Sequence, residues 1–353
     1  MNKIALFPYQ SSAVGFYRIL QPGRVLVREK LFKEARSLPF SGDEQAQYYE
    51  FNDQLYLKLT ENADILWSTV VYKPEYITKF LNLREHNTNR DTKQYCKTVF
   101  DMDDNLYAVP IDNPVQQQVE SLKHNFQACL QEADGVTVST PQLKKLYEKI
   151  NPNIYINPNG IDFNIWDKLK TKHTKKIRIG WRGAFGHRDD LELIRGALTA
   201  IMKDYDVTFV TLGWGGFKSD FPVEKHQHTE SIFDYPDKLA SLNLDLAIVP
   251  LVDSAYNRCK SNIAYLEYSA LKIPTVLSPV ENQKGMVALE AQSNFEWYQA
   301  LEKLIKDKEY RLKLGEDAYK FVKENYDIKK LSHPLAKWFE ELKFRDEIKP
   351  PKK

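Results

Sequence analysis

The stretch IRIGWRGAFGHRDDLELIRGALTAIMKDYDVTFVTL, residues 177–212, contains the unit that decides the fold. Its two ends, 177–181 and 207–212, are short apolar runs of the kind that form buried parallel strands. Between them, apolar side chains recur at the spacing of one helix face: Leu191, Ile194, Leu198 and Ile201. A strand, a helix and a second strand in this order predict a parallel βαβ unit.

The same alternation extends over most of the chain. Further short runs rich in Val, Ile, Thr and Phe lie at 4–7, 65–71, 98–101, 135–139, 154–157, 246–249 and 275–277. They predict two doubly wound, Rossmann-like α/β domains, and the turn-forming cluster NPNGID at 157–162 marks the join. We expect an N-terminal domain over 1–165, a second domain over 166–335, and a last helix with a basic tail over 336–353.

Composition limits the classes of protein. Of 353 residues, 50 are Lys or Arg and 48 are Asp or Glu, and a hydrophobic share of 42% excludes intrinsic disorder. The net charge of +2 argues against a surface that binds nucleic acid everywhere. The scattered Cys96, Cys129 and Cys259 indicate neither a disulfide framework nor a zinc site. We expect a cytoplasmic protein, because no segment resembles a membrane span or a signal peptide.

One candidate site is DSAYNRCKSNIAYLEY, residues 253–268, which follows the strand at 246–249. Read as a helix, it places Lys260 and Glu267 on one stripe, about 10 Å apart by helical rise. A Lys beside the free N–H groups of a helix N-terminus suits a phosphate, and Glu267 suits the vicinal hydroxyls of a ribose. The alternative is a solvated Lys and a Glu bonded to nearby backbone.

A second candidate is the loop GWRGAFGHRDDL, residues 180–191. Its glycines allow a ligand to approach the backbone closely. Arg182, His187 and Arg188 supply positive charge beside a helix N-terminus, which suits a diphosphate. The loop is neither a Walker loop nor GxGxxG, and a turn carrying surface Arg and His is the alternative.

Two other glycines follow predicted strands. Gly15 lies in the loop after the first strand, which faces the ligand crevice in doubly wound domains, with Arg18 as a candidate anion contact. Gly213 opens the run GWGG, which either closes over a ligand or turns the chain.

The third candidate is VFDMDDN, residues 99–105, a strand that runs into Asp101, Asp103 and Asp104. Such a run can hold Mg²⁺ or Mn²⁺, cap the next element or bind sugar hydroxyls. Burying three like charges is costly, so at least one should be solvated. No Ser-His-Asp order, HExxH or nucleophile elbow indicates a hydrolase, and the cations and carboxylates suggest a nucleotide-linked donor instead.

These motifs resemble those of the retaining GT-B glycosyltransferases of the family-4-like group, in a variant found in bacterial surface-polysaccharide clusters and phage genomes. The resemblance runs from about Phe100 to Asp327. It is carried by KSN at 260–262, LEYSALKIPTV at 266–276, ADGVTVST at 133–140, NGID at 159–162 and ENYD at 324–327.

The resemblance implies a GT-B fold: two Rossmann-like domains that face a central cleft, with a C-terminal helix that crosses back to the first domain. It also implies transfer of a hexose or pentose from a nucleoside-diphosphate sugar, UDP- or GDP-linked, to a hydroxyl with retention of configuration. No cofactor or metal is required in this interpretation. The acceptor is either a surface polysaccharide or lipid-linked glycan, or a hydroxymethylated base in phage DNA.

The resemblance also implies roles for residues. Arg182 and Lys260 would hold the leaving diphosphate, assisted by His187 or Arg188, while Glu267 would bind the ribose. Asp101 or Asp103 would orient the acceptor or stabilise positive charge on the sugar. The donor-binding candidates are together Gly15, Arg182, His187, Arg188, Gly213, Lys260, Ser261, Asn262 and Glu267.

Two other classes stay open. Cys259 stands where the group has a glutamate, and Asp101-Met102-Asp103 stands where it has His-Asp, so a non-catalytic protein that binds nucleotide sugars is one alternative. A sugar-nucleotide epimerase is another. Peripheral membrane contact would use a basic amphipathic patch, for which Lys30, Lys33 and Arg36 are candidates, and the solvated face of a helix is the alternative for these residues.

Overall fold

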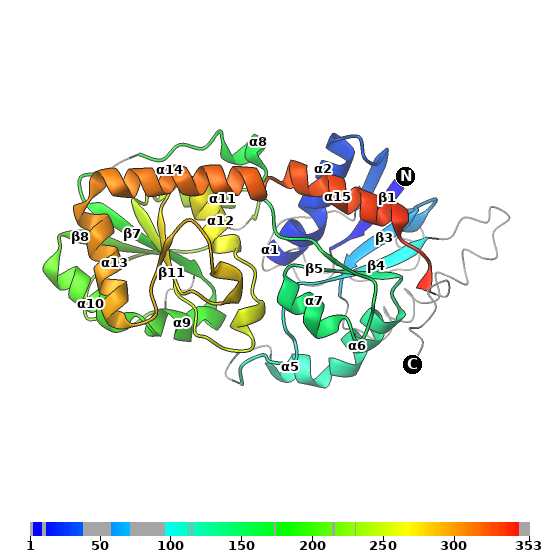
Figure 1. Ribbon diagram of the computed structural model, residues 1–353, viewed down its shortest axis with the longest axis horizontal. Coiled ribbons are helices and arrows are strands. Elements are labelled where there is room, and N and C mark those ends of the chain that lie inside the picture. Colours follow the sequence, from blue (N-terminus) through cyan, green and yellow to red (C-terminus); the bar gives the residue numbers. More distant parts are fainter. Residues whose placement is uncertain are drawn as a thin grey trace. The chain divides into compact units, whose positions relative to one another are not determined.

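The computed structural model describes residues 3–8, 12–37, 58–70, 96–111, 113, 116–172, 174–213, 216–229 and 231–345. The chain divides into two compact units. Unit 1 comprises Met1–Ile111, Val115–Asn159 and Ile328–Lys353, and unit 2 comprises Asp112–Pro114 and Gly160–Asp327. In the described residues each unit is built on a parallel sheet of six strands flanked by helices, so the predicted α/β class is confirmed (Figure 1).

The sheet of unit 1 has the order β2-β1-β3-β4-β5-β6. Its strands are β1 (Lys3–Phe7), β2 (Glu34–Ser37), β3 (Ile65–Thr69), β4 (Lys97–Met102), β5 (Gly135–Val138) and β6 (Ile154–Ile156). Its helices are α1 (Ala13–Gly15), a π-helical turn (Phe16–Leu20), α2 (Gln21–Arg28), α5 (Gln116–Ser121), α6 (Lys123–Glu132), α7 (Pro141–Tyr147) and α15 (Ile328–Glu341). The strand order reverses beside β1, as in other doubly wound sheets.

The sheet of unit 2 has the order β12-β11-β10-β7-β8-β9. Its strands are β7 (Ile177–Gly183), β8 (Val207–Gly213), β9 (Val223–His226), β10 (Leu246–Val249), β11 (Thr275–Leu277) and β12 (Leu289–Glu290). Because β7 is the first of these in sequence, this is the Rossmann order 3-2-1-4-5-6 read from the opposite edge. Its switch point therefore lies between β7 and β10.

The helices of unit 2 cover both faces of this sheet. They are α8 (Phe163–Trp166), α9 (Arg188–Glu192), α10 (Arg195–Asp204), α11 (Tyr235–Ser241), α12 (Ile263–Ala270), α13 (Asn294–Lys306) and α14 (Lys308–Asn325). Short 3₁₀ turns are η2 (Phe185–His187), η3 (Asn257–Cys259) and η4 (Glu281–Gln283). Helix α10 packs against α13 and α12 packs against α14, and Figure 1 shows α10 and α14 on opposite sides of the sheet.

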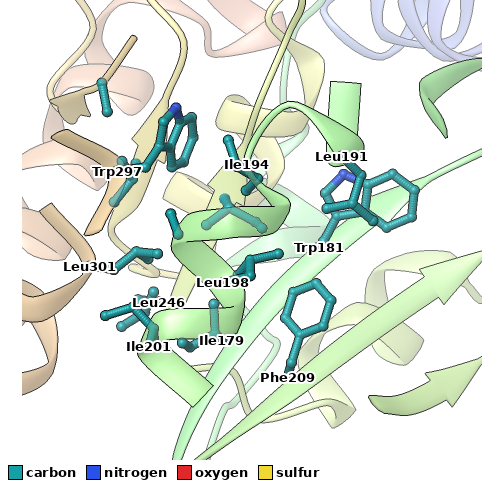
Figure 2. Packing of buried hydrophobic residues seen from close by; sticks show 14 of the residues in the cluster. Ile179, Trp181, Leu191, Ile194, Leu198, Ile201, Phe209, Leu246, Trp297 and Leu301 are labelled. Carbon is teal, nitrogen blue, oxygen red and sulfur yellow. The ribbon is translucent and has the colours of Figure 1, made fainter. Parts of the chain in front are cut away.

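The apolar stripe of residues 191–201 lies in the core of unit 2, as predicted. All of its members are fully buried with Trp297 and Leu301 of α13 (Figure 2). The stripe spans two helices, however, because the side chain of Asn294 replaces one of the backbone hydrogen bonds that a continuous helix would have. Its Nδ2 donates to the Leu193 carbonyl at 3.3 Å and its Oδ1 accepts from Ala197 N–H at 2.8 Å. In an unbroken helix these two groups would bond to each other.

The last helix, α15, belongs to unit 1, which confirms the predicted return of the chain to its first domain. It packs against α2, and its Phe339 ring lies edge-on to Trp67, with centroids 5.3 Å apart. Gly135 on β5 makes room for Trp338 and Leu342, because a Cβ there would lie 2.8 Å from both side chains. The helix begins at Ile328.

The edge strands β2, β9 and β12 were not predicted from the sequence. The basic patch at Lys30, Lys33 and Arg36 was also wrongly interpreted as a helix. Helix α2 ends at Arg28, Lys30 adopts a left-handed φ of 60°, and Arg36 lies on β2. The segment therefore presents no amphipathic helix.

Candidate functional site

The carboxyl ends of β7 and β10 meet at the switch point of unit 2, where doubly wound sheets bind their ligands. Strand β7 ends in Arg182 and Gly183, which pair with Leu212 and Gly213 at the end of β8. The loop after β7 contains η2 and leads into α9, while the loop after β10 covers residues 250–262. These two loops and the strand ends beside them hold most of the predicted donor-binding residues.

Arg182 is held by a buried carboxylate. Its Nη2 lies 2.7 Å from Oε2 of Glu267 on α12, and the Tyr235 hydroxyl at the start of α11 donates to the same oxygen at 2.8 Å. Glu267 is 1% exposed, and the Arg182 side chain keeps 19% exposure. Burial, and then the negative charge of Glu267, raises the pKa of Tyr235 well above 10, so the phenol stays a donor.

Lys260 does not lie on the helix that carries Glu267, which corrects the predicted stripe. Lys260 is extended (φ −62°, ψ 144°) and α12 begins only at Ile263. The sequence suggested one helix because IAYLEYSA continues the apolar spacing, but Asn and Ser before it favour a turn. The Lys260 Nζ lies 3.1 Å from the Tyr256 hydroxyl and 4.5 Å from the centroid of that ring.

The backbone around Lys260 is fixed from outside the loop. Asn282 on η4 donates to the carbonyls of Arg258 and Lys260, at 2.9 and 3.1 Å. Ser261 is half-buried, and Asn262 is buried at the N-cap position of α12. Lys260 and Ser261 therefore lie on a turn at the N-terminus of α12, and Asn282 holds the backbone of this turn in place.

His187 and Asp190 connect the two loops of the switch point. His187 Nδ1 lies 2.8 Å from Oδ2 of Asp190, on the first turn of α9. The other oxygen, Oδ1, accepts from the Val252 N–H at 2.7 Å and from the Asn257 amide at 2.8 Å. Asp190 thus ties η2 to the segment that carries Lys260.

Arg188 lies on the surface of the same loop. Its Nε is 2.9 Å from Asp189 Oδ1, and its guanidinium lies 5.5 Å from the centroid of the exposed Phe185 ring. The side chain is 38% exposed. His187, by contrast, is connected to the second loop through Asp190.

Gly213 has a structural reason to be glycine. Its φ is +104°, and a Cβ there would lie 2.5 Å from the carbonyl oxygen of Gly183 and 2.2 Å from Nε2 of His228. L side chains rarely adopt this conformation. The glycine therefore lets the end of β8 lie close to the end of β7 and to His228.

In unit 1, Asp101 is the centre of a buried polar network. Arg18 Nε and Nη2 donate to its two oxygens at 2.9 and 2.8 Å, and the Thr137 hydroxyl donates to Oδ1. Arg18 Nη1 also bonds the Asn157 carbonyl and the Asn159 side chain, at 2.7 and 2.9 Å. Arg18 is 1% and Asp101 2% exposed. The suggested role of Arg18 as an anion contact is therefore wrong, since the guanidinium is buried against these partners.

The other acidic residues after β4 are half-buried. The Asp103 carbonyl accepts from Ser139 at 3.2 Å, and the Asp104 carbonyl accepts from Tyr147 at 2.9 Å. Gly15 is buried at the end of α1. Within the part of the chain that the structure describes, no three His, Cys, Asp or Glu side chains are grouped so that they could hold a metal ion.

Sequence reasoning missed Tyr235, Asp190 and Asn257 as site residues. Tyr235 lies before β10 with no motif around it, and its contact with Glu267 arises only in the folded sheet. Asp190 lies within the loop identified at 180–191 but was given no role there. An acid three residues after a His, on a loop leaving a strand, is the signal that could have drawn attention to it.

The sequence matches no family model and no curated protein. Solved structures do resemble it. S. aureus TarM, in complex with Fondaparinux, alpha-GlcNAc-glycerol and UDP, is 16% identical with a TM-score of 0.56. The match covers 81% of this chain and 57% of TarM, so the chain spans less than two thirds of that protein.

Two further structures match almost end to end. Anabaena Alr3699/HepE, in complex with UDP-glucose, has a TM-score of 0.64 and 10% identity, with 97% of this chain and 99% of that chain covered. An alpha-glucosyltransferase bound to UDP and a 13-mer DNA with a central A:G mismatch has a TM-score of 0.63 and 11% identity, with 95% and 98% covered. The two sheets and these matches confirm the two Rossmann-like domains of the predicted GT-B fold. None of the helices in the described residues has the length and apolar content of a membrane span.

Proposed function

We propose that the chain is a glycosyltransferase that takes a hexosyl or pentosyl group from a nucleoside-diphosphate sugar. The observation that supports this most strongly is the placement of cations at one switch point: Arg182 lies in the last two residues of β7, and Asp190 connects the loop of His187 to the loop of Lys260. A doubly wound sheet binds phosphates at this place. The similar folds of HepE and the alpha-glucosyltransferase, both solved with UDP or a UDP-sugar, agree with such a donor.

The chemistry follows from the charge that develops on the leaving diphosphate. Arg182 and Lys260 stabilise this charge, and the free N–H groups at the start of α12 add a partial positive charge. Removing one such contact typically lowers the rate by about 10²–10³-fold. Glu267 and Tyr235 hold Arg182 in place while it does so. In the proposed reaction the acceptor oxygen bonds to the sugar from the face that the diphosphate leaves, the bond between the sugar and the diphosphate breaks, and the hydroxyl proton passes to the departing diphosphate, so configuration is retained.

The acceptor is proposed to be either a polysaccharide or lipid-linked glycan, or a hydroxymethylated base in DNA. TarM was solved with glycan ligands and the alpha-glucosyltransferase with DNA, so the fold accommodates both classes in other proteins. We propose no required metal, with Asp103 as the candidate that orients the acceptor. Asp101 is already committed to Arg18 and Thr137.

The test offers UDP- and GDP-sugars to the protein with each acceptor class in turn. Release of the nucleoside diphosphate together with an NMR spectrum of the product establishes transfer and its stereochemistry. Lys260→Ala should lose at least about 100-fold in rate. The matched control, Lys284→Ala, changes an exposed Lys that pairs with Glu281, and it should keep its rate.

Binding of a diphosphate without transfer to any acceptor would instead support a binding protein. Interconversion of free sugar nucleotides, with no diphosphate released, would support an epimerase. Either result contradicts the proposed transferase.

A further inference from the structure

Asp190 is buried more deeply than a surface helix acid should be. It is 3% exposed, yet it lies on the first turn of α9 beside the exposed Asp189, whose side chain is 61% exposed. A buried carboxylate is tolerated only when its oxygens are satisfied. Here they are, by His187 on one side and by Val252 and Asn257 on the other.

The partner of His187 determines which ring nitrogen carries the proton. An ionised carboxylate only accepts hydrogen bonds, so Nδ1 at 2.8 Å from Asp190 Oδ2 must be the donor. The neutral ring then has its lone pair on Nε2. His187 has 33% of its side chain exposed, and among the described residues Nε2 has no protein partner.

We propose that Asp190 is a positioning residue of the donor site: its carboxylate accepts from Nδ1–H, orients the His187 ring so that Nε2 faces the diphosphate, and stabilises the positive charge of the ring once Nε2 is protonated. On taking up a proton from solvent at Nε2, the ring donates Nε2–H to a phosphate oxygen, and the Asp190 carboxylate stabilises the imidazolium that results. This inference rests on the proposed function, since it assigns the diphosphate as the partner of His187.

The same carboxylate fixes the second loop. Its Oδ1 accepts from Val252 and Asn257, and the Asn257 amide also donates to the Val252 carbonyl at 3.0 Å. Asn257 opens η3, which leads directly into Lys260. One buried group therefore sets the position of both a His and a Lys toward the same ligand.

Asp190→Asn separates the two roles of Asp190, which are to hold the His187 ring and to connect the two loops. The Asn oxygen can still accept from Val252 and Asn257, so the connection between the loops is kept. Its amide, however, donates toward His187 Nδ1, which moves the ring proton to Nε2. A carboxylate-to-amide change of this kind leaves geometry intact and reverses the tautomer.

The first readout needs no ligand. The ¹⁵N spectrum of the neutral histidine ring should show pyrrole-like Nδ1 and pyridine-like Nε2 for His187 in the unmodified protein. In Asp190→Asn the two should be exchanged, and in the control Asp189→Asn they should be unchanged. A merely structural role for Asp190 predicts no exchange, and an unchanged His187 tautomer in Asp190→Asn overturns the proposal.

The second readout is the affinity for UDP and for GDP, each titrated separately. His187→Ala removes the ring, and Asp190→Asn leaves a neutral ring that can donate Nε2–H but lacks the positive charge that the carboxylate stabilises. Each variant should therefore weaken binding at least tenfold, and the double variant should be no weaker than His187→Ala alone. If Asp190→Asn lowered the affinity by the same factor in the unmodified protein and in His187→Ala, the proposal would be overturned, because Asp190 would then act by connecting the two loops and not through His187. Thermal unfolding of every variant checks that it is folded.

A failure of the proposed function can be distinguished from a failure of the inference about Asp190. Absence of binding of either diphosphate by the unmodified protein contradicts the proposed function. The tautomer measurement then still decides whether Asp190 holds His187 as inferred.

Discussion

At the residue scale, the contrast between Asp101 and Asp190 shows how neighbours decide what a carboxylate can do. Both are buried and both accept three hydrogen bonds. Asp101 is neutralised by Arg18, whose guanidinium is itself enclosed. Asp190 instead contacts a partly exposed His at the switch point of unit 2, the edge where we propose that the donor binds. The first arrangement stabilises unit 1, and the second is suited to a site.

Asp101→Ala should therefore lower stability. Removing one partner of a buried ion pair leaves an uncompensated charge and costs about 3–5 kcal/mol. Urea unfolding monitored by fluorescence would measure the loss. If stability were unchanged while transfer to acceptor disappeared, Asp101 would have the direct catalytic role suggested by the sequence.

Glu267→Gln distinguishes two roles for that side chain. If Glu267 orients Arg182, as its contacts indicate, the substitution should weaken the binding of UDP and of 2′,3′-dideoxy-UDP by the same factor, about tenfold or 1.4 kcal/mol. Calorimetric titration of both ligands measures this. A loss confined to UDP would show that Glu267 binds the ribose hydroxyls, the role that the sequence resemblance implies.

At the element scale, the close approach of the end of β8 to the end of β7 depends on Gly213. Gly213→Ala should lower the free energy of unfolding by more than about 1 kcal/mol, because both the φ and the contact with Gly183 oppose a Cβ. Gly285→Ala is the control, since Gly285 also has a positive φ of 74° but a Cβ on it would have nothing within 4 Å. Equal losses in the two variants would contradict a role for packing against Gly183.

Strands β7 and β9 are connected through an ion pair that makes unit 2 sensitive to acid. Arg178 holds the pKa of Glu224 at about 2, below the ordinary 4.5, with His226 as a further partner. Because the folded-state pKa is depressed, this stabilisation is present above pH 4.5 and is lost as the pH falls toward 2. The Glu224 side chain is 38% exposed, so the effect is small.

Glu224→Gln should therefore flatten the dependence of stability on pH below 4.5 and leave the curve above it parallel to the original. Urea unfolding at a series of pH values measures both curves. An unchanged slope in the acid range would show that the pair does not contribute.

Interior elements could be predicted from sequence, because a buried strand or helix face needs apolar residues and these appear directly in its own sequence. Strands such as β10, with LAIV, are apolar throughout. The edge strands β2 and β9 read EARS and VEKH, because an edge strand is exposed and its pairing leaves no apolar pattern. The break between α9 and α10 comes from Asn294, about a hundred residues away along the chain, and no local pattern reports it.

At the scale of the whole molecule, each unit has its own sheet and core, and the chain returns to unit 1 through α15. The fold class and this return could be predicted because alternating strands and helices are a property of the whole sequence. For the candidate site, the sequence predicted cations at 182, 187 and 260, and the structure places these residues on the strand end and loops of one switch point. Their connections through Glu267, Tyr235 and Asp190 could not be predicted, because they join residues from separate elements.

The proposed donor site at the β7/β10 switch point is tested most directly by calorimetric titration of UDP and GDP into the protein and into Lys260→Ala, with Lys284→Ala as the control. We expect one diphosphate to bind the protein and the control alike, and to bind Lys260→Ala at least tenfold more weakly. At 100 times its Kd that ligand should also stabilise the folded protein by about 2.7 kcal/mol. Equal affinity for Lys260→Ala and the unmodified protein, or binding of neither diphosphate, would contradict a donor site at this switch point.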